Sequence, residues 1–332
     1  MKIEQLHTNQ RLLILELIKR GASWESIDEF EELVAIHYKG RTEYLLDRFS
    51  SKVPFHMVKA TADKYLTKNI LKKNGLSVPE GNVFTAERVS EALDFAKGIY
   101  PVVLKPNWGS HGDNVQVDIR DEKSLMDAIN NFKTKTSNVN AFIIEEFKPW
   151  HEHRFFITSL GEYAIVKRDP AFVIGDGSSN IKKLVEQENY LRVKLKKEKP
   201  TSLCPIVIDD EVHRYMEQNK SSLTYCPKRG EKFYLRRESN LAKGGVAVNL
   251  THTAHPSIIK IAKQALAAFP GMPCVGLDIL CKDITKYVSK DDYVIIEVNS
   301  SPGLAMHTYP SYGMPENVAE KLANVMFPDF FK

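Results

Sequence analysis

Two short apolar strands near the end of the chain constrain its fold most strongly, because each contains an acid. Residues 294–299 read VIIEVN, and residues 275–280 read VGLDIL. Side chains two positions apart on a strand point to the same face of the sheet, so Glu297 and Asn299 share a face. If the two strands pair across the connection between them, Asp278 joins this face. Three oxygen ligands of the kind that magnesium prefers then converge.

The alternative for each of these residues is a solvated position on a half-covered sheet. Two acids that meet across paired strands are harder to explain in this way. Unit charges about 4 Å apart repel by roughly 4 kcal/mol at an effective dielectric constant near 20. A shared and partly dry face therefore requires a cation or a proton, and the arrangement indicates nucleotide chemistry.

Size and composition limit the remaining possibilities. A chain of 332 residues exceeds the usual size of one core, so two or three subdomains are expected. The net charge of +4 comes from interspersed acids and bases, without the basic stripe of a nucleic-acid binder. The apolar stretch at residues 12–18 contains Glu16 and is too short to span a membrane. The four cysteines lack CxxC spacing, and we expect reduced thiols in a cytoplasmic protein.

Hydrophobic patterns divide the chain into three predicted parts. Residues 1–57 are a small N-terminal domain, with a helix over residues 7–20 and a hairpin that turns at Lys39 and Gly40. Residues 58–148 alternate between helices and strands, which is typical of a mixed α/β module. Residues 149–332 contain longer strands and a closing helix. No chemistry is assigned to the N-terminal part.

Lys105 lies in the apolar strand YPVVLKP. Burying an ammonium group without a partner is costly, so this side chain either reaches solvent or faces an anion. The loop over residues 107–114 contains Gly109 and Gly112, where backbone amides can approach phosphate oxygens. A plain hairpin is the alternative for the glycine pair alone. A lysine strand followed by a glycine loop favours phosphate binding.

The apolar strand at residues 141–147 ends with two acids, Glu145 and Glu146, and Glu152 follows soon after. Carboxylates and free backbone groups at a strand end, here at Glu145, Glu146 and Glu152, can bind adenine amino groups and ribose hydroxyls. The alternative is that these acids are simply solvated.

Arginines recur near strand positions. A guanidinium group forks around carboxylates and phosphates, so Arg154, Arg168 and Arg236 from different strands predict an anion pocket. Surface salt bridges are the alternative. The sequence has no GxSxG motif, no convincing cysteine–histidine pair and no Walker loop, so no nucleophile is predicted.

An ordered series of motifs resembles the ATP-grasp superfamily. The series is DK at 63–64, VVLKPNWGSHGDNV at 102–115, IIEEF at 143–147, HEHR at 151–154, VIGDG at 173–177, LRRESNLAKGG at 235–245, GLDIL at 276–280 and IIEVNSSPGLAMHTYP at 295–310. Within the superfamily, the chain looks most like the ATP-grasp modules of cyanophycin synthetase and of bifunctional glutathione synthetase. The resemblance covers roughly residues 60–328.

The resemblance implies an α/β (α+β) fold of the ATP-grasp type, in which two α+β subdomains grip ATP between them after a short N-terminal leader. The implied nucleotide-binding residues are Lys64, Lys105, Gly109, Ser110, Gly112, Glu145, Glu146, Phe147 and Glu152. The implied ligands of magnesium are Asp278, Glu297 and Asn299, with Glu297 bridging two ions and manganese as a substitute. The implied catalytic residues are Arg154, Arg168, Arg236 and Asn240, and Ser301 and His307 border the substrate.

The resemblance also implies an activity, the ATP-dependent joining of a carboxylate to an amine through an acylphosphate. An amino acid or a peptide is the implied substrate, with neither a nucleic acid nor a membrane as partner. Related modules often self-associate, so a homo-oligomer is a further expectation. The alternatives are a kinase of the same fold and a non-catalytic ATP-binding partner subunit.

The chain departs from the related sequences at several positions. Asp113 and Asn114 occupy the end of the phosphate loop, where a glycine is usual, and an acid there is unfavourable unless it points away from phosphate. Asn249 replaces an aspartate that the related proteins carry. The related enzymes also have a further large catalytic domain, which this chain is expected to lack.

Overall fold

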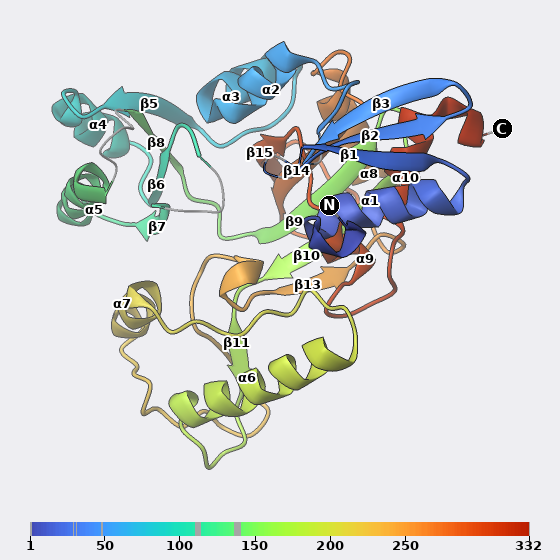
Figure 1. The fold of residues 1–332 in the computed structure, drawn as a ribbon. Helices are drawn as coiled ribbons and strands as arrows, with labels where there is room; N and C mark the ends of the chain where they lie inside the picture. The colour runs from blue at the N-terminus through green and yellow to red at the C-terminus, as the bar shows by residue number, and fades with distance from the viewer. Residues whose placement is uncertain are drawn as a thin grey trace. The chain divides into compact units, whose positions relative to one another are not determined.

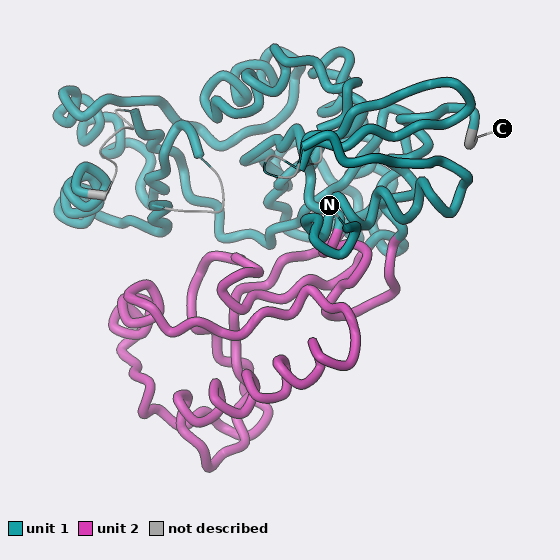
Figure 2. Tube along the Cα trace, in the orientation of Figure 1, with its two compact units in different colours: residues 1–165, 251–304, 317–332 teal, residues 166–250, 305–316 magenta. Residues whose placement is uncertain are grey.

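The computed structural model of the protein describes residues 2–28, 30, 32–47, 49–109, 114–135 and 141–331. The chain forms two units, which are described separately (Figure 2). Unit 1 contains Met1–Ile165, Thr251–Leu304 and Asn317–Lys332, and unit 2 contains Val166–Leu250 and Ala305–Glu316. Within the described residues, no helix combines the length and the apolar character needed to cross a membrane.

Unit 1 begins with a helix and a four-stranded antiparallel sheet (Figure 1). The elements are η1 (Ile3–Gln5), α1 (Thr8–Lys19), β1 (Ser23–Asp28), β2 (Leu33–Tyr38), β3 (Arg41–Leu46) and β4 (Phe49–Ser50). Lys39 and Gly40 turn the hairpin between β2 and β3 with φ values of 48° and 73°. Two successive left-handed residues are typical of a tight hairpin turn. The predicted helix and the predicted hairpin are therefore confirmed.

The next part of unit 1 has a second four-stranded sheet with the strand order β5-β8-β6-β7. Its elements are α2 (Phe55–Ala62), α3 (Lys64–Lys73), β5 (Gly81–Thr85), α4 (Val89–Ala96), β6 (Val102–Pro106), β7 (Gln116–Ile119), α5 (Glu122–Lys135) and β8 (Ala141–Glu146). Helices α4 and α5 pack on the face that carries Leu104 and Ile144. Because strand side chains alternate, Lys105 and Glu145 face away from these helices.

The remaining part of unit 1 is a sheet in which β10, β9, β14 and β15 are neighbours in that order. Its elements are β9 (His151–Thr158), β10 (Tyr163–Asp169), α8 (Pro256–Ala267), β14 (Cys274–Cys281), β15 (Tyr293–Asn299), α10 (Val318–Met326) and η3 (Pro328–Phe331). Helices α8 and α10 both pack against β9. The chain passes from unit 1 to unit 2 within β10.

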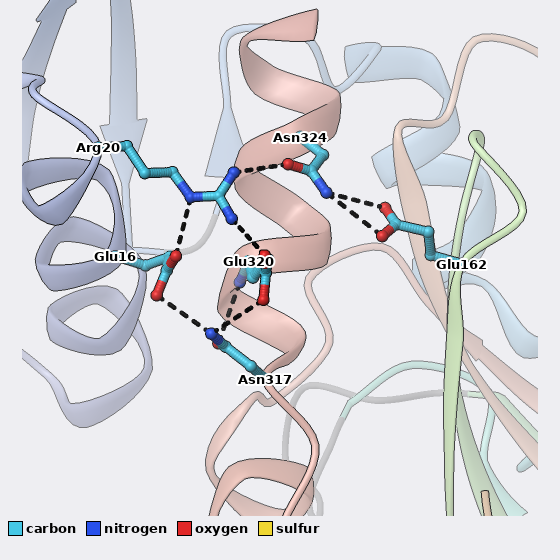
Figure 3. Close-up of polar contacts among 6 residues, drawn as sticks. All are labelled: Glu16, Arg20, Glu162, Asn317, Glu320 and Asn324. Atoms are coloured by element: carbon cyan, nitrogen blue, oxygen red, sulfur yellow. Dashed lines mark hydrogen bonds and ion pairs between the residues drawn. The ribbon is translucent and has the colours of Figure 1, made fainter. Parts of the chain in front are cut away.

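The N-terminal helix and the C-terminal helix of unit 1 share one core. Leu13 and Leu17 of α1 are buried in the same cluster as Leu322 and Met326 of α10. Polar side chains continue this contact at its edge (Figure 3). The guanidinium of Arg20 donates to Glu16 at 2.8 Å, to Asn324 at 2.7 Å and to Glu320 at 2.6 Å. The division of residues 1–57 into a domain of their own stays a prediction.

Unit 2 contains the end of β10 and the elements that follow it. These are β11 (Phe172–Ile174), α6 (Ile181–Glu198), α7 (Asp210–Gln218), β12 (Lys232–Tyr234), η2 (Leu241–Lys243), β13 (Val246–Asn249) and α9 (Ala305–Thr308). β13 pairs with β10, and β11 pairs with β12. The VIGDG motif requires glycine at Gly175, because a Cβ there would lie 2.2 Å from the carbonyl oxygen of Lys228.

Candidate functional site

The two acid-bearing strands pair, which is the condition under which the sequence brings their acids together. In the antiparallel register of β14 and β15, Asp278 lies opposite Glu297, and Gly276 lies opposite Asn299. The register shifts just after Asp278, so Ile296 is an extra residue on β15. Such a bulge turns the strand locally and is common beside functional sites. Asp278, Glu297 and Asn299 therefore share one face of the sheet.

The positively charged side chain of Arg154 lies beside these acids. On its other side, Asp278 pairs with Arg154 of β9. The Arg154 guanidinium donates to both carboxylate oxygens of Asp278, with its Nη2 at 2.8 Å from Oδ2 and its Nε bound to Oδ1. Both side chains are buried. Burial opposes the charge of Arg154, but Asp278 outweighs it and the pKa of Arg154 is raised.

Two lysines share one buried carboxylate on the second sheet of unit 1. Lys68 of α3 donates to Oε2 of Glu145 at 2.7 Å, and Lys105 of β6 contacts Oε1 at 2.6 Å. Burial favours the neutral form of Glu145, but Lys105 and Lys68 outweigh it, and the pKa of Glu145 is lowered. The side chain of Glu145 thus fixes two ammonium groups on one side of the sheet.

Lys64 brings a third ammonium group to the same region. Its Nζ donates to the carbonyl oxygen of Gly109 at 2.6 Å. Burial lowers the pKa of Lys64, Glu297 opposes this effect, and Lys105 adds to it. Lys105 in turn donates to the carbonyl oxygen of Ile296, next to Glu297, at 3.4 Å.

The charges in this region do not balance. Three buried ammonium groups, on Lys64, Lys68 and Lys105, surround the buried carboxylate of Glu145, and the half-buried acids Glu297 and Asp63 also act on Lys64. Among the buried groups of this cluster, positive charge is therefore in excess. The Arg154–Asp278 pair is neutral as a whole and does not change this excess. A buried excess of positive charge favours an anionic ligand.

Polar atoms without a hydrogen-bond partner lie at the end of β15. The side-chain amide nitrogen (Nδ2) of Asn299 and the hydroxyl of Ser301 are both buried, and neither has a hydrogen-bond partner among the described residues. Asn299 and Arg154 also lie close together, since a Cβ on Gly276 would be 3.4 Å from the Asn299 Cβ and 3.5 Å from the Arg154 Cδ. Unpaired buried polar groups at one place are a sign of a ligand site.

The other predicted nucleotide-binding residues are placed as follows. Glu146 forms an ion pair with Lys148, and the backbone of Phe147 donates to the carbonyl oxygen of Pro101 at 2.9 Å. Glu152 is half-buried on β9. Gly109 has a φ of 112°, which favours glycine. Ser110, Gly112 and Asp113 lie outside the described residues.

Four of the predicted residues belong to unit 2. Arg236 is buried, and its Nη2 donates to Asp209 at 2.9 Å and to the carbonyl oxygen of Val207 at 2.8 Å. Asn240 caps the short helix η2, where its side chain accepts from the backbone of Ala242 at 2.9 Å. Arg168 lies on β10. His307 lies fully buried on α9.

Asn249, which replaces the expected aspartate, also belongs to unit 2. Its side-chain amide donates to the carbonyl oxygen of Met314 at 2.5 Å, and its backbone donates to Tyr312 at 2.9 Å. The amide therefore makes a contact that a carboxylate at this position cannot make, because a carboxylate has no donor.

Sequence reasoning missed two residues that support the predicted ones. Lys68 follows Lys64 by four positions, and this spacing on a helix could have indicated that both lysines share a face. Asp209, the partner of Arg236, also binds Lys243 at 2.7 Å and gave no signal in the sequence.

In the described part of the chain, no group of three or more His, Cys, Asp or Glu residues could hold a metal. A metal site here thus depends on the amide of Asn299 beside two carboxylates.

Comparisons with known proteins agree with this description. No family model matches the chain. Cyanophycin synthetase of Geminocystis herdmanii is 32% identical over 325 residues, which is 96% of this chain and 36% of that protein. The glutathione biosynthesis bifunctional protein of Clostridium perfringens is 28% identical over 331 residues, which is 98% of this chain and 41% of that protein. The chain therefore spans well under half the length of these relatives.

A solved structure has the same fold. The bifunctional glutathione synthetase from Pasteurella multocida superposes with a TM-score of 0.70 and 22% identity, over 98% of this chain and 44% of that one. The predicted resemblance to cyanophycin synthetase and to bifunctional glutathione synthetase is confirmed. The chain has the predicted α+β fold of the ATP-grasp type.

Proposed function

We propose that this chain is an ATP-dependent ligase that joins the carboxylate of an amino acid or a peptide to an amine. The observation that carries the proposal is the pair of neighbouring charge systems in unit 1. One is the lysine group around Glu145, and the other is the acid face formed by Asp278 and Glu297. The first suits the phosphates of a nucleotide, and the second suits the cation that accompanies them.

The lysine group fits a nucleotide phosphate. Lys64 and Lys105 would bind phosphate oxygens, since their ammonium groups belong to a buried cluster with an excess positive charge. Lys68 and Glu145 would hold Lys105 in place through the two contacts of the shared carboxylate. We propose that the backbone and acids at the end of β8, including Glu146, contact the adenine and ribose.

The acid face fits magnesium, because its side chains offer carboxylate and amide oxygens, the ligands that this hard cation prefers. Asp278, Glu297 and Asn299 would hold the ion, with Glu297 as the bridging ligand if two ions bind. Manganese, which accepts the same oxygen ligands, would substitute. When bound, the metal would neutralise phosphate charge and align the transfer of the phosphoryl group.

The chain's own residues then have distinct tasks. Arg154 orients the carboxylate of Asp278 through two hydrogen bonds, so that this ligand cannot turn away from the site. We propose that Arg168, Arg236 and Asn240 of unit 2 stabilise the negative charge that spreads over the reacting carboxylate and the phosphoryl group. Phosphorylation of the carboxylate would supply a good leaving group, and the amine would then displace phosphate.

Further proposals concern the substrate and the setting of the protein. The unpaired Ser301 hydroxyl, together with His307, is proposed to border the substrate. The similarity to cyanophycin synthetase and to a glutathione biosynthesis protein supports an amino acid or peptide substrate. Four free thiols support a cytoplasmic location, and self-association remains a proposal.

An ADP-release screen tests the proposed function. Purified protein is incubated with ATP, magnesium and pools of amino acids and dipeptides, and the products are identified by mass spectrometry. A ligase yields ADP, phosphate and a new amide, whereas a kinase yields ADP and a phosphorylated acceptor. A non-catalytic partner subunit binds ATP without turnover in every pool. The variant Glu297→Gln serves as the matched control, because it keeps the shape of the site and removes one charge.

A further inference from the structure

The N-terminal helix contacts the segment that leaves the acid face. The side-chain oxygen of Asn9, on α1, accepts a hydrogen bond from the backbone amide of Leu304 at 2.8 Å. The two residues are 295 positions apart, and both are buried, with exposed fractions of 7% for Asn9 and 0% for Leu304. Buried backbone amides almost always have a partner, so Asn9 supplies an acceptor that Leu304 requires.

Leu304 closes a five-residue segment, residues 300–304, that follows Asn299 directly. Pro302, in the middle of this segment, packs against Gly276 of strand β14. A Cβ on Gly276 would be 3.0 Å from the Cβ of Pro302, and the same position lies close to Asn299 and Arg154. Glycine at position 276 thus lets Pro302 approach the strand beside two proposed site residues.

Ser301 directly precedes Pro302, between this anchored residue and Asn299. Its hydroxyl is buried and makes no hydrogen bond to the described residues. A short segment held at Pro302 by packing and at Leu304 by a hydrogen bond has little freedom to turn, so the direction of this hydroxyl depends on both anchors. The side chain of Leu304 adds to the second anchor, since it is buried in the same core as Leu13 of α1.

We propose that Asn9 is a positioning residue, through which the N-terminal helix sets the segment 300–304 and the side chains of Asn299 and Ser301 beside it. This inference rests on the proposed ligase function, in which these side chains border the metal and the substrate. It gives the N-terminal part of the chain, to which the sequence assigned no chemistry, a role in the site.

Hydrogen exchange and kinetics test the inference on the full-length protein. Asn9→Ala removes the acceptor, and Asn9→Asp keeps it. Gln10→Ala is the matched control, because Gln10 is also buried on α1 but donates to the carbonyl oxygen of Glu32 at 2.8 Å. We expect the Leu304 amide to exchange on the order of tenfold faster in Asn9→Ala than in Gln10→Ala, and Asn9→Asp to restore its protection.

The kinetic readout separates positioning from stability. Asn9→Ala should raise KM for the acceptor substrate or lower kcat by roughly fivefold or more, with KM for ATP within about twofold of wild type. Gln10→Ala should change neither. If Asn9→Ala does not fold, Asn9→Ser replaces it, because serine is too short to reach the same amide.

Two results would overturn the inference. One is equal Leu304 exchange in the Asn9 and Gln10 variants, and the other is faster exchange with wild-type kinetics. Exchange requires no turnover, so the two proposals can fail separately. A wild-type protein that binds ATP but forms no ADP with any acceptor would refute the ligase function and the catalytic half of the inference. The exchange comparison would still decide whether Asn9 holds the segment.

Discussion

Asp278 lies directly opposite Glu297 across two paired antiparallel strands, and both acids face the same side of the sheet. The fork of Arg154 balances the charge of Asp278 from the neighbouring strand. The two acids therefore differ in their surroundings, although the sequence presents them in similar apolar strands. Arg154 orients Asp278. Burial lowers the pKa of Lys64, and the negative charge of Glu297 opposes this effect.

Glu297→Gln should leave the protein folded and lower magnesium-dependent ADP formation by about a hundredfold or more, because the amide keeps the shape and removes a metal-binding charge. Steady-state ATP turnover with an accepted substrate and a thermal melt provide the measurement. If Glu297 were only a solvated strand residue, the change would alter stability by no more than about 0.5 kcal/mol and leave the rate intact. Turnover at the wild-type level would refute the metal assignment.

Lys105→Ala should weaken ATP binding by roughly tenfold or more, since charge-assisted contacts contribute about 1.5 to 3 kcal/mol. Titration calorimetry with ATP measures this loss, and a thermal melt checks the fold. Unchanged affinity would remove Lys105 from the nucleotide site.

Lys68→Met should act mainly on stability. It leaves Glu145 buried with one of its two lysines, which costs about 1 to 3 kcal/mol. ATP affinity should fall less than in Lys105→Ala, because Lys68 acts through Glu145. Denaturant unfolding and calorimetry on both variants make the comparison. A larger loss of ATP affinity in Lys68→Met than in Lys105→Ala would mean that Lys68 is the phosphate ligand.

Arg154→Met should destabilise unit 1 by about 3 to 5 kcal/mol, because it leaves the Asp278 carboxylate buried without its cation. The double variant Arg154→Met with Asp278→Asn should recover much of this loss, since the uncompensated charge is also removed. Denaturant unfolding of the two variants measures both effects. If the single and double variants are equally unstable, the damage comes from lost packing around Arg154 and not from the charge.

Loss of the proton from the buried lysines at alkaline pH should affect ATP affinity and their contribution to stability in opposite directions. The pKa values of Lys64 and Lys68 are lowered by burial from the ordinary lysine value of 10.5. As pH rises through these lowered values, the ammonium groups are lost and ATP affinity falls. At these two lysines the unfolded chain binds more protons than the folded chain in this window, so their contribution to the free energy of unfolding rises with pH. Burial raises the pKa of the Cys274 and Cys281 thiols, and these two groups act in the opposite direction. Calorimetry between neutral pH and 10.5 should show the fall in ATP affinity, and Lys64→Met should reduce it. Unfolding of wild type and Lys64→Met over the same range isolates the lysine contribution, because the difference in free energy of unfolding between the two proteins should change with pH.

Several features followed from the sequence because they depend on neighbours along the chain. The helix near residues 7–20 and the turn at Lys39 and Gly40 were predicted from local patterns, and the acid in each of the strands β14 and β15 was visible in the sequence. The α+β fold was implied by the resemblance of the ordered motifs to the ATP-grasp superfamily.

The tertiary structure alone decided which side chains meet. Lys68 binds Glu145 across 77 positions, Arg154 binds Asp278 across 124, and Asn9 binds Leu304 across 295. A local pattern can place a side chain on one face of a strand or helix, but it cannot set the register between distant strands or the packing of a helix on a loop. Those depend on burying the whole apolar core at once, so the partners of buried charges emerge only when the chain is folded.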